Sequence, residues 1–71
     1  MSLAPQTIID QLRRRKTFLG SRETVALLDT TRKTLGEWVA AGRLPAYKLG
    51  KNWKFDPADL VRFLEERRVG V

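Results

Sequence analysis

The feature that constrains this chain most is the stretch from Ala40 to Phe55, AAGRLPAYKLGKNWKF. It follows a segment whose apolar residues recur at helical spacing, and after Pro45 the pattern changes to alternation of apolar and polar residues. Gly42 fits the left-handed position that ends a helix, and Pro45 prevents the helix from resuming. The stretch therefore predicts a helix that ends near Ala41 and leads directly into a short β-hairpin.

The hairpin is predicted to have one apolar and one cationic face. Strand alternation places Lys48 and Lys54 on one side, with the turn expected at Gly50-Lys51-Asn52. The other side is expected to hold four apolar residues, which are Tyr47, Leu49, Trp53 and Phe55. A hairpin of this kind packs its apolar side on a core and exposes its lysines.

Two short helices precede the hairpin. The first is expected over about Arg22–Leu28 with Ser21 as its N-cap, and the second over about Arg32–Ala41 with Thr31 as its N-cap. The connection Asp29-Thr30-Thr31 is short and polar, which permits only a tight turn. Two helices joined in this way form a helix-turn-helix.

A further helix is predicted at each end of the chain. One covers roughly Pro5–Lys16 and carries an apolar stripe of Ile8, Ile9 and Leu12. This stripe must pack on the domain or join two copies of the chain. The other covers about Pro57–Arg68, where Asp56 is the expected N-cap and the apolar face consists of Leu60, Phe63 and Leu64.

These elements predict a mainly α-helical fold with a small β-hairpin, a winged helix-turn-helix with an extra N-terminal helix. We expect residues 1–18 to form the appended helix or arm and residues 19–71 to form the winged helix-turn-helix domain. A chain of 71 residues makes one small domain, which buries only about 60% of its unfolded surface. Little of it is left over for a catalytic cleft.

The charge of the chain is strongly positive in its central part. Fourteen Lys and Arg residues against eight Asp and Glu give a formal net charge of +6. Residues 13–54 contain eleven basic and three acidic side chains, a local charge of +8. Such a field attracts polyanions at long range, nucleic acid first and anionic membrane second.

The chain offers few side chains suited to catalysis or metal binding. The chain has no histidine and no cysteine, so it offers no zinc ligands of these types, no thiolate nucleophile and no imidazole base. Asp56 and Asp59 are close in sequence, but helix capping explains them. We therefore expect no enzyme, with no catalytic residues, metal site or cofactor. Without cysteines, a secretory signal or an apolar run of membrane-spanning length, a cytoplasmic protein is the default expectation.

The second helix of the pair supplies the first candidate DNA contacts. Arg32 and Lys33 lie in its first turn, the end that a recognition helix inserts into the major groove, where each can donate to guanine or phosphate. Glu37 can accept from a cytosine amino group, and Thr31 lies at a helix N-terminus, which suits a phosphate. Thr31 is equally well explained as a cap. Trp38 has core spacing and is expected to pack rather than stack on a base.

The hairpin supplies the second set of candidate contacts. Lys48, Lys51, Asn52 and Lys54 gather on a protruding loop that can follow the DNA backbone or enter the minor groove. Asn52 is also a residue that tight turns favour. Arg43, just after the second helix, is placed to reach a flanking phosphate. The run Arg13-Arg14-Arg15-Lys16 is a weaker feature that can meet DNA, a partner protein or solvent alone.

An ordered set of motifs resembles the excisionase-like branch of the MerR-type winged-helix DNA-binding proteins over about Leu19–Arg68. The matching residues are Glu23-Thr24-Val25-Ala26, Leu28, Thr34-Leu35, Trp38-Val39, Gly42-Arg43-Leu44-Pro45-Ala46, Lys48-Leu49-Gly50, Trp53-Lys54-Phe55 and Asp59-Leu60. The resemblance implies a bacterial, phage or mobile-element protein whose helix from Arg32 enters the major groove and whose Gly50–Asn52 loop contacts the backbone or minor groove. Asp29-Thr30 replaces the Gly and aliphatic residue common in that turn, and Gly36-Glu37 stands where relatives often carry arginine.

Two roles within that family fit the resemblance, with double-stranded DNA as the partner in both. An excisionase bends DNA beside a recombination site and cooperates with integrase, whereas a small regulator binds a promoter operator and acts on RNA polymerase. A monomer of this size makes few base contacts, so specificity requires repeated sites, self-association on DNA or a partner protein. A role of a different class is a basic adaptor or antitoxin-like module that binds an acidic partner. No membrane partner is expected.

Overall fold

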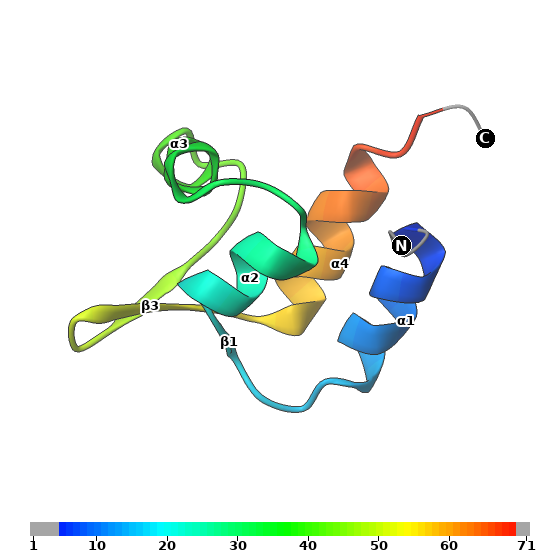
Figure 1. Cartoon of the computed structure of the whole chain (residues 1–71), viewed down its shortest axis with the longest axis horizontal. Helices are drawn as coiled ribbons and strands as arrows, with labels where there is room; N and C mark the ends of the chain where they lie inside the picture. The colour runs from blue at the N-terminus through cyan, green and yellow to red at the C-terminus, as the bar shows by residue number, and fades with distance from the viewer. Residues whose placement is uncertain (1–4, 70–71) are drawn as a thin grey trace.

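The computed structural model describes residues 5–69. In chain order its elements are α1 (Pro5–Arg14), β1 (Leu19–Gly20), α2 (Ser21–Leu27), α3 (Arg32–Ala40), β2 (Tyr47–Leu49), β3 (Asn52–Phe55) and α4 (Pro57–Glu66). The hairpin of β2 and β3 projects from the same end of the molecule at which α3 lies, while α1 packs beside α4 at the other end (Figure 1). The predicted class, mainly helical with a small antiparallel sheet, is confirmed.

The sheet has three strands rather than the two of the predicted hairpin. Their order is β1-β3-β2, and both pairings are antiparallel. Leu19 lies opposite Phe55 and Gly20 opposite Lys54, which ties the start of α2 to the central strand. The sequence patterns predict no strand before α2. Two residues are too few to show the alternation typical of a strand. The pairing of β1 also depends on a partner far along the chain, which no local pattern indicates.

The hairpin turn is shorter than predicted. Leu49 lies opposite Asn52, so the loop consists of the two residues Gly50 and Lys51, and Asn52 begins β3. Gly50 has a φ of +68°, which suits the first position of a two-residue hairpin loop. Loops of this length match the twist of the strands that they join, which explains why the expected three-residue turn at 50–52 is wrong.

The shorter turn exchanges the faces of β2 relative to β3. Directly opposite residues of an antiparallel pair share a face. One face therefore holds Lys48 with Trp53 and Phe55, and the other holds Lys54 with Tyr47 and Leu49. The predicted separation into an apolar and a cationic face is wrong. Phe55 is fully buried, whereas Tyr47 and Leu49 are 47% and 51% exposed.

Three of the predicted helix boundaries depend on local chemistry and are confirmed. The Thr31 hydroxyl accepts a hydrogen bond from the backbone N–H of Thr34 at 3.1 Å and caps α3. Gly42 has a φ of +74° just after α3. At the start of α4 the Asp56 carboxylate accepts from the N–H of Ala58 at 2.9 Å.

The start of α2 differs from the prediction. Gly20, not Ser21, occupies the N-cap, and no side chain makes a capping hydrogen bond there. Instead the hydroxyl of Thr24, which is fully buried, donates to the carbonyl of Gly20 at 2.8 Å. The backbone of Gly20 is already fixed by its pairing in the sheet, so α2 begins directly from the end of β1.

The core lies where the sheet, α3, α4 and α1 meet. Its buried apolar residues are Leu12, Leu19, Leu35, Leu44, Phe55, Leu60, Val61 and Phe63. Leu12 of α1 is 2% exposed, Ile8 and Ile9 pack against the same cluster, and Arg13 donates to Glu65 of α4 at 3.0 Å. The apolar stripe of α1 is thus covered by its own chain. Both terminal helices end two residues before their predicted ends, at Arg14 and Glu66.

Candidate nucleic-acid interface

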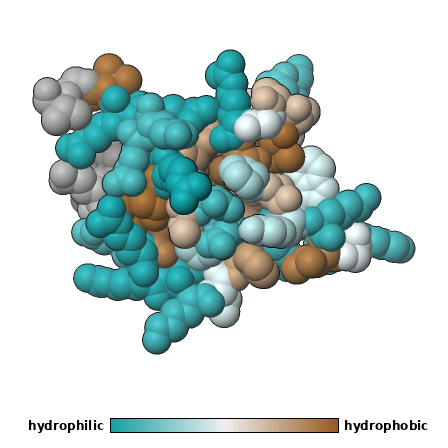
Figure 2. Space-filling view, turned by 180° about the vertical axis from the view of Figure 1, so that it is seen from behind, coloured by the Kyte–Doolittle hydropathy of each residue, from teal (hydrophilic) through white to brown (hydrophobic). Residues whose placement is uncertain are grey.

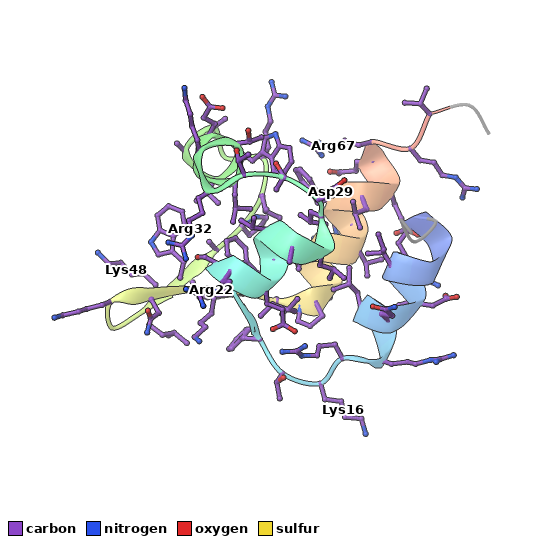
Figure 3. The ribbon with its side chains drawn as sticks, in the orientation of Figure 1. Lys16, Arg22, Asp29, Arg32, Lys48 and Arg67 are labelled. Atoms are coloured by element: carbon purple, nitrogen blue, oxygen red, sulfur yellow. The ribbon has the colours of Figure 1, made fainter. Side chains whose placement is uncertain are left out.

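A tight turn joins α2 to α3. Asp29 adopts a φ of +52°, the left-handed conformation that favours glycine, and this reverses the chain between the two helices. The N–H of Thr30 donates to the carbonyl of Val25 at 3.1 Å and so closes the end of α2. The two helices and this turn, where Figure 3 marks Asp29, form a helix-turn-helix.

Packing decides which side of α3 faces solvent. Leu35 is buried, and the Trp38 ring lies against Phe63 with ring centroids 4.9 Å apart. Trp38 therefore packs on the core, as predicted. On the outer side Arg32, Lys33 and Glu37 are all exposed. The helix thus presents two exposed cations, Arg32 and Lys33, at its N-terminal end.

A groove of about 480 Å³ lies between the start of α2, the start of α3 and the hairpin. We refer to it as the basic groove, and its lining residues are Gly20, Ser21, Arg22, Arg32, Lys51, Asn52, Trp53 and Lys54. Figure 3 labels Arg22 on α2 and Arg32 on α3, on the side of the molecule from which the hairpin projects. Three elements that are separate in sequence thus contribute four cations to one concave surface.

The basic groove contains some of the predicted contact residues and not others. It brings together Arg32, Lys51, Asn52 and Lys54. The five other predicted contact residues do not line the groove, although they are exposed. They are Thr31, Lys33, Glu37, Arg43 and Lys48. Lys48 shares the core side of the hairpin with Trp53, because of the register described above.

Arg22 is the cation of the groove that the sequence analysis missed. It lies in the first turn of α2, and only the pairing of β1 with β3 brings that turn beside the hairpin. Its position in the first helix of a helix-turn-helix was a usable signal, since that helix crosses the DNA backbone in such proteins.

The cations of the basic groove have no carboxylate partners among the described residues. The ion pairs in residues 5–69 join Arg13 to Glu65, Arg15 to Glu23 and Arg67 to Glu66. The pKa of Glu23 is lowered mainly by its hydrogen bond with Arg15 and to a lesser extent by the charges of Arg15 and Lys54. The groove therefore keeps its positive charge for an external anion.

A helix-turn-helix with an exposed basic end, set beside a basic hairpin, defines a DNA-binding protein of the winged helix-turn-helix class. A family model described as a helix-turn-helix domain matches residues 18–68, which is most of the chain. The chain belongs to this helix-turn-helix family of DNA-binding proteins, which confirms the resemblance at that level. No curated protein and no solved structure matches the chain.

Two further properties concern residues 5–69 only. Within this range no three His, Cys, Asp or Glu side chains lie close enough together to hold a metal ion. None of the helices described is both long enough and apolar enough to cross a membrane.

Proposed function

We propose that this protein binds double-stranded DNA with α3 in the major groove and with the hairpin, from here on the wing (Tyr47–Phe55), on the backbone or in the minor groove. The observation that carries the proposal is the basic groove, because Arg32 of α3 and Lys51 of the wing line the same surface. The two elements protrude at the same end of the molecule (Figure 1). A duplex that receives α3 therefore lies within reach of the wing.

The proposed contact residues divide into two roles. Arg32, Lys33 and Glu37 read base edges from α3, with the two cations donating to guanine and the carboxylate accepting from cytosine. The remaining residues contact phosphates and set the position of the protein on the duplex, and they are Thr31, Arg43, Lys48, Lys51, Asn52 and Lys54 together with Arg22.

In the cell this DNA-binding protein acts in the cytoplasm as an excisionase, which directs recombination, or as a small transcriptional regulator. Integrase is the partner in the first role and RNA polymerase in the second, and self-association on repeated sites supplies the base contacts that one small domain lacks. A neighbouring integrase gene favours the excisionase. Selection of bound sequences from a random duplex pool, followed by footprinting, gives the target, the spacing of repeats and any bend.

The salt dependence of binding tests the proposal directly. If five or six cations meet phosphates, the logarithm of the association constant falls with the logarithm of salt concentration at a slope of about −5. A fluorescently labelled duplex titrated at several salt concentrations measures this slope. A slope near zero contradicts the proposal and favours the adaptor or antitoxin-like role.

Replacing Arg22 with alanine tests the geometry of the basic groove. We expect Arg22→Ala to weaken binding to every duplex and to make the salt slope shallower by about 1 unit, since one phosphate contact is lost. Arg62→Ala is the matched control, because Arg62 is exposed on α4 and does not line the basic groove. Equal effects of the two substitutions argue against the groove as the binding surface.

A further inference from the structure

A second groove, of about 720 Å³, lies between the end of α1, the loop that follows it and the start of α4. We refer to it as the rear groove, and its lining residues are Leu12, Arg13, Arg15, Lys16, Thr17, Phe18, Asp56, Pro57, Ala58 and Val61. None of them lines the basic groove. The DNA-binding function proposed above leaves this surface without a role.

The floor of the rear groove is apolar. Leu12, Pro57 and Val61 are buried residues that reach its surface. Phe18 forms part of its wall and remains 44% exposed, with its ring centroid 5.4 Å from that of Tyr47, itself 47% exposed. Through this pair the apolar surface continues onto the face of the sheet that holds Tyr47 and Leu49. Figure 2 shows that the face turned away from the viewer in Figure 1 carries patches of hydrophobic surface between hydrophilic side chains.

Basic side chains outnumber acidic ones in the lining of the rear groove, with Arg13, Arg15 and Lys16 against Asp56, although Arg13 and Arg15 already pair with carboxylates. Lys16 makes no ion pair among the described residues, and Figure 3 shows it at the edge of the molecule away from α3. Arg13 contacts Glu65 through a pair in which both side chains are more than half exposed. Asp56 is the acid in the lining, and its carboxylate already accepts from the N–H of Ala58.

Arg15 fixes the shape of the rear groove rather than adding a free charge. Its guanidinium donates to the Thr17 hydroxyl, to the Phe18 carbonyl and to the Glu23 carboxylate. These bonds hold the loop against the first turn of α2. Phe18 is thus held at the wall of the groove through its backbone, while its side chain remains 44% exposed.

We propose that the rear groove docks a segment of a partner protein in which an apolar side chain is flanked by carboxylates. The apolar side chain enters between Phe18 and Val61, and the carboxylates meet Lys16 and Arg13. An apolar floor beside the unpaired Lys16 and the largely exposed Arg13 matches this chemistry and does not suit a second duplex, whose phosphates would lie over Leu12 and Pro57. Because the two grooves share no residue, the protein binds DNA and this partner at the same time.

The test uses the full chain and a labelled twelve-residue peptide in which Leu and Phe are flanked by Glu. We expect saturable binding in fluorescence polarisation, no saturable binding of a control peptide with Ala in place of Leu and Phe, and amide shifts centred on Thr17 and Phe18. Lys16→Glu weakens binding roughly fivefold, whereas Arg62→Glu, the same charge change outside the groove, leaves it within about twofold. Phe18→Ala weakens it about tenfold.

Several outcomes overturn the proposal. These are the absence of saturable peptide binding up to about 1 mM, equal binding of the alanine control peptide, and equal effects of Lys16→Glu and Arg62→Glu. Displacement of the peptide by a duplex also overturns it, because the peptide then occupies the basic groove. Since Phe18 is exposed, Phe18→Ala is expected to fold and to bind DNA as the parent does, so that loss of peptide binding is separable from loss of DNA binding.

Discussion

Arg15 donates two hydrogen bonds to the carboxylate of Glu23, one of them from Nη2 to Oε1 at 2.9 Å. A bidentate pair of this kind is stronger and more directional than a single contact. It joins the loop after α1 to the first turn of α2, where Arg22 faces the basic groove and Phe18 the rear groove. One ion pair therefore supports residues of both proposed interfaces.

This pair makes stability depend on pH in the acidic range. The hydrogen bond from Arg15 lowers the pKa of Glu23 below its ordinary value of 4.5. A carboxylate with a depressed folded-state pKa contributes stability above its unfolded pKa, and this contribution is lost as pH falls through the folded value. Both side chains are partly exposed, so we expect a small effect.

Denaturant unfolding at pH 7 and at pH 3 measures this effect. The free energy of unfolding of the parent should fall more between these pH values than that of Glu23→Gln, which has no carboxylate to titrate. Arg15→Lys keeps the positive charge but loses the bidentate guanidinium contact. Its fall in the free energy of unfolding between pH 7 and pH 3 should lie between those of the parent and of Glu23→Gln. Identical pH dependence of the parent and Glu23→Gln contradicts the assignment.

Lys33 and Lys51 should differ in what their loss does to DNA binding. Lys33 is on the outer side of α3 and Lys51 at the tip of the wing. Lys51→Ala should weaken binding to all sequences alike, whereas Lys33→Ala should change which sequences are preferred, by about 1–3 kcal/mol at the affected base. Selection from a random duplex pool with each variant distinguishes these results. If both variants bind every duplex as the parent does, the assigned interface is wrong.

Gly36 lies in the middle of α3, and a Cβ added there meets nothing within 4 Å in the free protein. Gly36→Ala should therefore raise the free energy of unfolding by up to about 1 kcal/mol through helix propensity. If the α3 backbone approaches the duplex closely at this point, the same substitution should lower DNA affinity by roughly tenfold. Thermal unfolding and duplex titration measure the two effects. Increased stability with unchanged affinity excludes the close approach.

Asp29 holds a left-handed conformation without the freedom of glycine. Asp29→Gly should raise the free energy of unfolding, by less than about 1 kcal/mol, because relief of the strain is partly offset by a more flexible unfolded chain. Asp29→Val should lower it by more than about 1 kcal/mol, since a β-branched residue tolerates this conformation poorly. A loss of stability in Asp29→Gly means that the carboxylate itself supports the turn.

The parts of the fold that sequence patterns predicted correctly are those with local causes. Thr31 caps α3 because its hydroxyl reaches an N–H three residues on, and Gly42 ends the same helix because its φ is positive. Asp56 likewise begins α4. Each of these signals lies within a few residues of its effect, so the fold class followed from the sequence.

The errors concern pairings between distant segments. β1 exists only because Leu19 meets Phe55, and no local pattern marks two residues as a strand. In the hairpin, the same sequence is compatible with a turn of two residues or of three. The length of the turn decides which side chains share a face. Arg22 was missed for the same reason, since only the sheet brings the start of α2 beside the wing.

In Figure 1, α1 begins and α4 ends on the side of the molecule remote from the wing. A fluorescent reporter or an affinity handle attached through a flexible linker at either terminus should leave α3 and the wing unobstructed. The protein is thus suited to immobilisation for single-molecule imaging of bound duplexes, with α3 and the wing directed away from the support.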